Sequence, residues 1–168
     1  MRQCVTSAWD SVFPFLPITA YVLLCVATLP RQRQRIPDRR HPILDSRSST
    51  NLTLVGFSFA VVGLLVTLFQ SDLLRVSQAT FLFSLSLAYF FASYILLYLR
   101  LWRAFDTLSE GLTNNGLWVV MGGLRSLFAA FSELQSISLI FTVLLWMLAA
   151  YIALDLSFKW QDRNKTEV

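Results

Sequence analysis

The residue most suited to chemistry is an arginine inside an apolar segment. Arg125, followed by Ser126, is the only charged residue of the stretch 117–131, which reads LWVVMGGLRSLFAAF. A charged side chain at membrane depth costs about 2.5–3.5 kcal/mol on insertion scales and is expected to face water or to find a partner. Glu133 and Asp155 are the nearest acidic candidates. These four residues are therefore predicted to form an intramembrane polar site.

Simpler interpretations exist for the same residues. Arg125 can instead extend from a flat or tilted helix to lipid phosphates, with its stem along the apolar surface. Asp72 is a third possible acidic partner. Asp155 lies four residues before Lys159, the spacing of an ion pair on one face of a helix.

Motifs of known catalytic or metal chemistry are missing from the sequence. It contains no glycine-rich phosphate loop, nucleophile elbow, H-E-x-x-H motif or pair of carboxylates at catalytic spacing. Two cysteines, Cys4 and Cys25, and one histidine, His41, do not make a cluster with metal-ligand spacing. We therefore predict no cofactor, no metal site and no enzymatic activity.

The elements that carry these residues are expected to be membrane helices. Hydrophobic residues are 55% of the chain and charged residues 14%, against about 45–50% and 25% in soluble domains. Runs without Asp, Glu, Lys or Arg, each of 18 residues or more, cover 12–29, 52–69, 76–99 and 137–154. Such runs cross a bilayer as helices, because lipid cannot satisfy an open sheet edge. The sequence predicts an all-α, polytopic membrane helix bundle, with 1–168 as one transmembrane domain.

A fifth, short or re-entrant span is predicted over 117–131. Its 15 residues reach only about 22 Å as a helix, which by hydropathy favours a helix lying flat at the interface. The distribution of Lys and Arg favours a crossing, because it leaves eleven basic residues on the cytoplasmic side and two outside. If the segment instead lies flat, nine basic residues are on the cytoplasmic side and five are outside.

A basic loop sets the expected orientation. Between residues 30 and 50 lie six arginines, and short loops rich in Lys and Arg stay in the cytoplasm. We expect the amino terminus outside the cell membrane and the carboxy terminus inside. A cleaved signal peptide is the alternative for the first thirty residues, but Asp10, Pro14 and Pro17 interrupt it and no A-x-A site follows.

The loop is also predicted to contact anionic lipid headgroups, which attract clusters of four to eight basic residues beside a membrane. The arginines concerned are Arg31, Arg33, Arg35, Arg39 and Arg40. Nucleic acid is not an expected partner, because interleaved aromatic residues are missing. The last three residues, Thr166-Glu167-Val168, suit a PDZ-type domain, which captures a terminal carboxylate and an apolar last side chain.

Small residues at helical spacing predict close helix packing. A stripe of this kind lets two backbones approach, within one chain or between chains. The short segment between 52–69 and 76–99 predicts an antiparallel hairpin, which favours packing within the chain. The predicted packing residues are Gly56, Ala60, Gly63, Ala88, Ala92, Ala149 and Ala153.

Helix ends are predicted from the breakers. The prolines and the polar run 45–50 predict an irregular loop until about residue 50. The third helix is expected to continue past Leu99 towards Glu110, and to end at Gly111 and Asn114-Asn115-Gly116.

The function that follows is a non-enzymatic multi-pass membrane protein. It would act through helix association, as a homo-oligomer or a subunit of a larger membrane complex, with the lipid bilayer and other membrane proteins as partners. The alternative is a protomer of an ion-conducting pore or small transporter, in which Arg125 faces a water path and favours anions. A membrane-embedded enzyme ranks third, because few polar groups converge.

Overall fold

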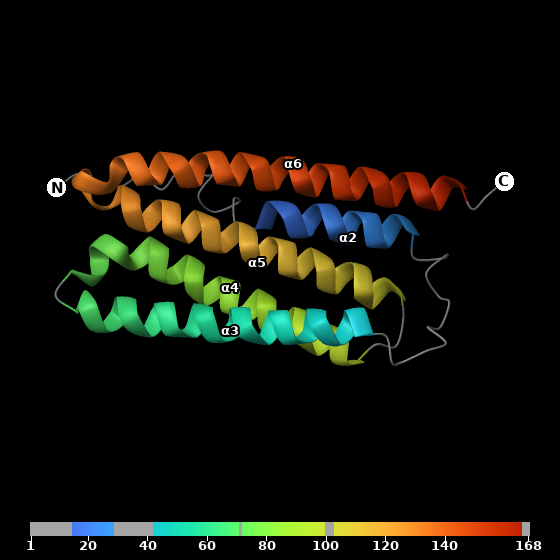
Figure 1. The fold of residues 1–168 in the computed structure, drawn as a ribbon, viewed down its shortest axis with the longest axis horizontal. Helices are drawn as coiled ribbons and strands as arrows, with labels where there is room; N and C mark the ends of the chain where they lie inside the picture. The colour runs from blue at the N-terminus through green and yellow to red at the C-terminus, as the bar shows by residue number, and fades with distance from the viewer. Residues whose placement is uncertain (1–14, 29–41, 71, 100–102, 166–168) are drawn as a thin grey trace.

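The computed structural model describes residues 15–28, 42–70, 72–99 and 103–165. Within them the chain is helical and contains no strand, so the all-α prediction is confirmed. The long helices run alternately in opposite directions and lie side by side in an elongated bundle (Figure 1). In chain order they are α2 Leu16–Thr28, α3 Pro42–Leu68, α4 Leu73–Leu99, α5 Arg103–Ala129 and α6 Gln135–Lys165, with a 3-10 turn, η2 Ser132–Leu134, before α6.

Three helices are long and apolar enough to cross a membrane. Their apolar portions are Arg47–Leu68 in α3, Leu74–Tyr98 in α4, and Ser132–Gln161 in η2 and α6. They correspond to the runs 52–69, 76–99 and 137–154. The apolar part of α2, Leu16–Ala27, is shorter. Residues 12–14 of the first predicted span lie outside the described residues.

The predicted hairpin of the second and third runs is present. α3 ends at Leu68 and α4 begins at Leu73. In the turn, the Asp72 amide donates to the Phe69 carbonyl at 3.0 Å, and the Arg75 amide donates to the Asp72 carbonyl at 2.9 Å. The two helices therefore pack antiparallel along their length (Figure 1).

The predicted start of the second helix was wrong. α3 begins at Pro42, so the polar run 45–50 is helical and not an irregular loop. Proline is favoured in the first helical turn, where its missing N–H would have no intrahelical partner. In α2 the early proline is Pro17, and the next amide, that of Ile18, donates to Asn115 Oδ1 of α5 at 3.1 Å. A side chain from another helix thus caps α2.

The predicted break at Gly111 and Asn114-Asn115-Gly116 was also wrong. α4 ends at Leu99, and α5 runs unbroken from Arg103 to Ala129 for 27 residues, about 40 Å. The fifth helix is therefore neither short nor confined to 117–131. The expected ending depended on residue types that favour turns in water. In this fold the asparagine side chains bond to neighbouring helices. The glycines, which have no side chain, let neighbouring helices pack closely.

Glycines of α5 allow aromatic rings to approach its backbone. A Cβ added to Gly111 would lie 2.6 Å from Tyr21 Cβ, and one added to Gly116 would lie 2.5 Å from the Phe90 ring. At Gly123 the nearest atom of the Phe83 ring would be 3.1 Å away. α5 thereby becomes the central helix, in contact with α2, α4 and α6. The core cluster includes Phe83 and Phe90, both fully buried.

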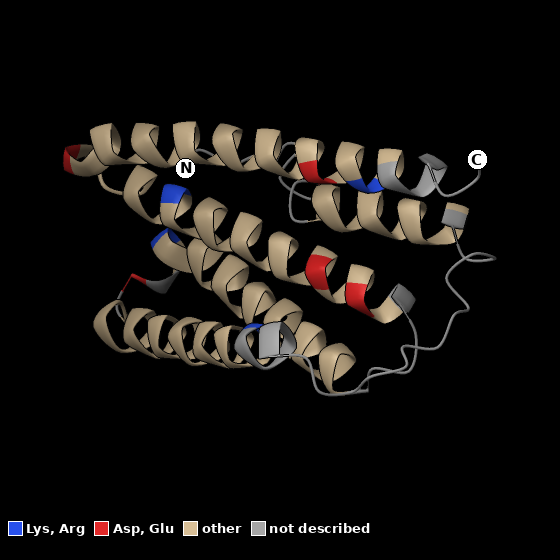
Figure 2. Cartoon of the chain, turned by 45° about the vertical axis from the view of Figure 1, so that its right-hand side comes forward, with Lys and Arg blue, Asp and Glu red and all other residues tan. Residues whose placement is uncertain are grey.

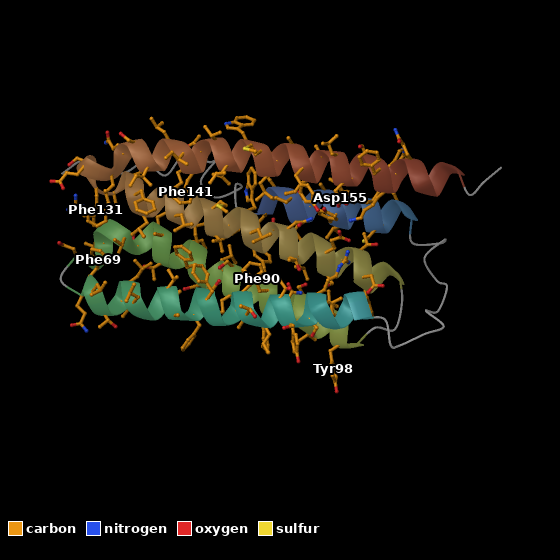
Figure 3. The ribbon with its side chains drawn as sticks, in the orientation of Figure 1. Phe69, Phe90, Tyr98, Phe131, Phe141 and Asp155 are labelled. Carbon is orange, nitrogen blue, oxygen red and sulfur yellow. The ribbon has the colours of Figure 1, made fainter. Side chains whose placement is uncertain are left out.

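The surface of the bundle is apolar and its interior contains many polar groups. Large side chains such as Phe59 (70% exposed) and Trp146 (74% exposed) face outward, and Tyr98 points away from the bundle (Figure 3). The middle of the bundle carries no described charge, since the coloured residues of Figure 2 lie towards the two ends. Buried polar residues are Asn51, Ser58, Ser86, Ser93, Ser109, Asn114, Asn115 and Ser138. This is the opposite of the usual arrangement in water, where large apolar residues are most often inside.

Candidate functional site

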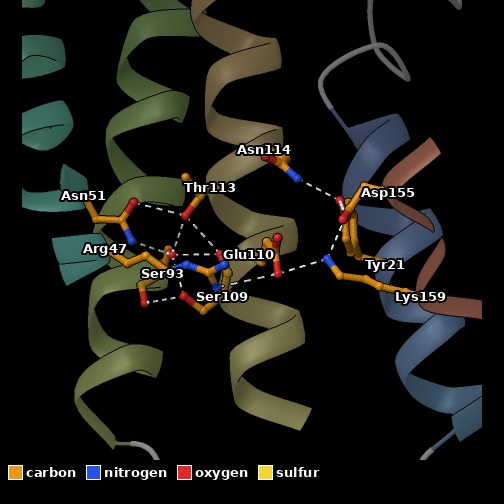
Figure 4. A network of polar contacts seen from close by, with 10 residues as sticks. All are labelled: Tyr21, Arg47, Asn51, Ser93, Ser109, Glu110, Thr113, Asn114, Asp155 and Lys159. Atoms are coloured by element: carbon orange, nitrogen blue, oxygen red, sulfur yellow. Dashed lines mark hydrogen bonds and ion pairs between the residues drawn. The ribbon is translucent and has the colours of Figure 1, made fainter. Parts of the chain in front are cut away.

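A network of polar side chains connects the helices at the end of the bundle where α3 and α5 begin (Figure 4). It contains two clusters, one on each side of α5. Four pairs of its residues are spaced four apart, so that each pair lies on one helix face. The pairs are Arg47 with Asn51, Ser109 with Thr113, Glu110 with Asn114, and Asp155 with Lys159.

The first cluster joins α3, α4 and α5 through uncharged groups. Its centre is the hydroxyl of Ser93, which accepts from Asn51 Nδ2 at 2.9 Å. The same hydroxyl lies 2.7 Å from Ser109 Oγ and 2.8 Å from Thr113 Oγ1. Thr113 in turn donates to Asn51 Oδ1 at 3.0 Å. Small hydroxyl side chains at this point let α4 and α5 approach closely, and the hydrogen bonds hold them together.

The second cluster joins α2, α5 and α6 and contains charges. The Tyr21 hydroxyl donates to Asp155 Oδ2 at 2.6 Å and accepts from Asn114 Nδ2 at 2.7 Å. Lys159 Nζ lies 2.6 Å from the same carboxylate oxygen, and 5.3 Å from the centre of the Tyr21 ring. The predicted ion pair between Asp155 and Lys159 is therefore present. Tyr21 anchors α2 to the carboxy-terminal half of α6.

Glu110 links the second cluster to α3. Its Oε2 lies 2.9 Å from Lys159 Nζ and 3.7 Å from Arg47 Nη1. The side chains of Glu110 and Lys159 are 23% and 22% exposed, so both charges are partly desolvated. Two cations and two carboxylates make the group neutral, which limits the cost of placing it between helices. Every buried side-chain N or O of the described residues has a hydrogen-bond partner.

A pocket of about 230 Å³ opens beside this network. Polar groups form its floor, among them Asn51, Ser109 and Thr113, and Arg47 and Tyr151 lie at its edge. Arg47 and Tyr151 are exposed, whereas Asn51 and Ser109 are buried. The pocket thus leads from the surface of α3 and α6 to the hydrogen-bonded face of α5.

The predicted intramembrane polar residues do not come together. Arg125 is exposed near the end of α5, and its side chain makes no ion pair with a described residue. Ser126 Oγ donates to Gln78 Oε1 of α4 at 3.0 Å, Glu133 is exposed in η2, and Asp155 belongs to the charged cluster with Tyr21. The expected pairing of Arg125 with Asp155 is therefore absent. Asp72, the third candidate, is also exposed.

The predicted packing residues lie at the surface or half-buried. Gly56, Ala60 and Gly63 are exposed on α3, and nothing lies within 4 Å of a Cβ added to either glycine. This stripe makes no close contact with the described part of the chain, which does not support the intrachain interpretation. Ala88 and Ala153 are exposed, and Ala92 and Ala149 are half-buried. The five loop arginines and Thr166-Glu167-Val168 lie outside the described residues.

The sequence analysis did not predict this network, because each of its residues is of a type that is common in membrane helices or at their ends. Serine, threonine and asparagine within apolar runs look like isolated helix-packing residues, and Glu110 was assigned to a helix end. The signal that could have found it is the repeated four-residue spacing of polar residues on several helices. Among the described residues, no group of His, Cys, Asp and Glu gathers where it could hold a metal ion.

Comparison with known proteins gives no further guidance. No family model, no curated protein and no solved structure matches the chain.

Proposed function

We propose that the chain is a non-enzymatic integral membrane protein that crosses the cell membrane five times and acts by helix association. Its partner is a second copy or another membrane protein. The outward apolar side chains and the inward serines and asparagines support lipid as its solvent, because lipid offers no hydrogen bonds to polar groups. The orientation proposed is amino terminus outside and carboxy terminus inside, in accordance with the basic loop.

The arrangement of helix ends supports five crossings. The end of α2, the beginning of α3, the end of α4, the beginning of α5 and the end of α6 lie at the same end of the bundle (Figure 1). α5 is less apolar than its neighbours, but its 27 residues give about 40 Å, enough for a core of about 30 Å. Its polar side chains Thr113, Asn114 and Ser126 bond to α3, α2 and α4, so these three do not require lipid to accept them.

The association surface proposed is the exposed face of α3 that contains Gly56, Ala60 and Gly63. The observation that carries it is the open space over both glycines, with nothing within 4 Å of an added Cβ. Small residues at this spacing let a second helix approach until the backbones make dispersion contacts. Because α4 packs on another face of α3, a helix from outside the chain can occupy this one.

The test is Gly63→Leu, with oligomer size measured by light scattering of purified protein and in native membrane extracts. A bulky side chain at Gly63 should separate the helices and convert the assembly to monomer. Val143→Leu adds bulk at an exposed position of α6 (59% exposed) and should leave the assembly intact. An unchanged assembly size for Gly63→Leu would remove this surface from the proposal.

Cross-linking then distinguishes a second copy from another protein. Gly63→Cys, in a chain whose Cys4 and Cys25 are replaced by serine, should form a disulfide-linked dimer on oxidation if α3 packs on α3 of a second copy. Absence of a dimer together with a stable larger complex would indicate a different partner.

Topology is tested separately by labelling cysteines introduced at Ser46 and Thr166 in intact cells and in opened vesicles. Five crossings require that both positions react only in opened vesicles. Opposite accessibility of the two positions would remove one crossing.

A second candidate function is a pore or small transporter. The observation in its favour is that Arg125 is exposed, with no ion pair to a described residue. In an oligomer, copies of Arg125 could surround a water path and favour anions. Anion flux in vesicles containing the purified protein, compared with flux for Arg125→Ala, tests this function. Absence of flux with the unaltered protein would exclude it.

A further inference from the structure

We propose that the pocket beside Glu110 binds a phosphoethanolamine group, a phosphate and a primary ammonium joined by two carbons. Such a group is carried by a lipid or by a small soluble molecule. The inference depends on membrane insertion, as in the proposed function, but it is independent of helix association through α3.

The pocket lies at the level expected for headgroups. Arg47 is the first residue of the apolar span Arg47–Leu68, and Leu97, which also lines the pocket, is next to the last residue of Leu74–Tyr98. Lipid headgroups meet a bundle at the ends of such spans. The volume of about 230 Å³ is below the range of about 300–1,000 Å³ typical of drug-sized ligands. A headgroup or a comparably small molecule suits this size.

Both charged residues that line the pocket have bonding capacity left. Among the described residues, Arg47 has one ionic contact, that of Nη1 with Glu110 at 3.7 Å, and its side chain is 48% exposed. Its other guanidinium N–H groups have no acceptor among the described residues, and a guanidinium fork matches a phosphate. Glu110 uses Oε2 for both ion pairs. Its Oε1 has no partner among the described residues and can accept from an ammonium.

Charge balance selects a zwitterion over a simple ion. The four charges of Arg47, Glu110, Asp155 and Lys159 already sum to zero (Figure 4). An anion bound by Arg47 alone would lie close to the carboxylate of Glu110, and a cation bound by Glu110 would lie close to two cations. A ligand with one charge of each sign meets both residues and keeps the partly desolvated group neutral.

The carboxylate of Glu110 favours a primary ammonium in the ligand. A carboxylate forms charge-assisted hydrogen bonds with N–H donors, which a primary ammonium has and a trimethylammonium lacks. Phosphoethanolamine should therefore bind more tightly than phosphocholine. The Asn51 amide, which also lines the pocket, has a second N–H besides the one that it donates to Ser93, and this N–H can donate to a phosphate oxygen.

The test measures binding to the purified full chain by calorimetry, with glycerophosphoethanolamine, glycerophosphocholine and inorganic phosphate in turn. The first two are phosphodiesters, in which the phosphoethanolamine or phosphocholine group carries one charge of each sign, as it does in a lipid. The same comparison is repeated in nanodiscs with phosphatidylethanolamine, phosphatidylcholine and phosphatidylglycerol. We expect the ethanolamine compounds to bind about tenfold more tightly than the others, the effect of one charge-assisted hydrogen bond. Binding in nanodiscs only would identify a lipid as the source, and binding of the soluble compound as well would identify the headgroup alone as sufficient.

Two variants test the two charges. Arg47→Gln should weaken phosphoethanolamine binding about tenfold. Glu110→Gln should weaken it similarly but strengthen binding of inorganic phosphate, because the pocket then carries a net positive charge. This reversal of preference is not produced by partial unfolding. Asp72→Asn removes an exposed carboxylate outside the pocket. It should change neither the affinity for phosphoethanolamine nor the affinity for inorganic phosphate.

The proposal is overturned if phosphate binds the unaltered protein as tightly as phosphoethanolamine, if none of these compounds binds, or if Arg47→Gln binds normally. Gly63→Leu separates it from the proposed association. A monomeric Gly63→Leu protein that binds phosphoethanolamine normally shows that the pocket works independently of α3 packing.

Discussion

The glycines of α3 and those of α5 have opposite surroundings. Gly56 and Gly63 of α3 have nothing within 4 Å of an added Cβ, whereas Gly111 and Gly116 of α5 would place one within 2.6 Å of aromatic side chains. Only the α3 glycines have the spacing that predicts close packing, and those of α5 were predicted to break a helix. In α5 the packing partners lie within the chain, whereas no described residue packs against Gly56 or Gly63 of α3. The spacing of small residues therefore does not by itself indicate where a close approach occurs within the chain.

Polar residues also differ between the α5 side of the bundle and the outward face of α3. The α5 side of the bundle holds Ser93, Ser109 and Asn115, each at most 1% exposed, in hydrogen-bonded contacts between helices. The outward face of α3 instead presents Phe57 and Phe59 beside its glycines. The stability of the isolated chain should therefore depend on the α5 side of the bundle. Assembly should depend on the outward face of α3.

The largest effect is expected from Gly111→Ala. The new Cβ would lie 2.6 Å from both Cβ and Cγ of Tyr21, atoms that cannot rotate away unless α2 moves. Overpacking of this kind costs about 3 kcal/mol, seen as a lower midpoint in denaturant unfolding of the detergent-purified protein. A midpoint within error of the unaltered protein would mean that α2 is not held against α5.

A smaller loss is expected from Ser93→Ala. It removes the hydroxyl that accepts from Asn51 at 2.9 Å and lies 2.7 Å from Ser109 Oγ. A buried amide donor without a partner costs about 1–2 kcal/mol, measurable in the same unfolding assay. Ser84→Ala, at an exposed serine of α4, is the matched control and should cost less. Equal losses would show that burial of the hydroxyl does not matter.

Gly63→Ala should change stability in the opposite direction. Its Cβ meets no atom, and alanine in a helix is favoured over glycine by about 0.5–1 kcal/mol. The unfolding midpoint of the monomer should rise slightly while that of Gly111→Ala falls. A loss of stability in dilute detergent, where assemblies dissociate, would contradict the open face of α3.

The smallest effect is expected from Arg125→Ala. The side chain is exposed and has no ion pair with a described residue, so unfolding should change by less than about 0.5 kcal/mol. Arg125→Lys should behave the same way. A loss as large as that of Gly111→Ala would indicate that Arg125 contacts a partner, in this chain or in an assembly.

Much of the fold could be predicted from the sequence because three of its helices are long, apolar runs without charged residues. The runs 52–69, 76–99 and 137–154 were each found as a helix, and the short connection correctly predicted the hairpin of α3 and α4. These predictions needed only hydropathy and loop length.

The centre of the bundle could not be predicted in the same way. Gly111 and Asn114-Asn115-Gly116 favour a turn when only their neighbours in sequence are considered. They nevertheless lie within α5, where Tyr21, Phe90 and the beginning of α2 contact them. Asp155 was assigned to the site of Arg125 because both are charged residues near apolar sequence. Tyr21 of α2, 134 positions away in sequence, lies against Asp155, and no local pattern encodes that contact.

If the chain enters a membrane as proposed, the polar character of α5 has a consequence for how the protein is made. Synthesis delivers α5 after α4 and before α6, so Glu110 emerges before Lys159, whose Nζ lies 2.9 Å from Glu110 Oε2 in the finished bundle. The hairpin of α3 and α4 is apolar enough to leave the insertion machinery for lipid on its own. α5 has to wait at the machinery, or remain against α4, until α6 is translated. A nascent chain arrested before α6 should therefore stay bound to the translocon or be degraded, whereas one arrested after α4 should already be in the bilayer.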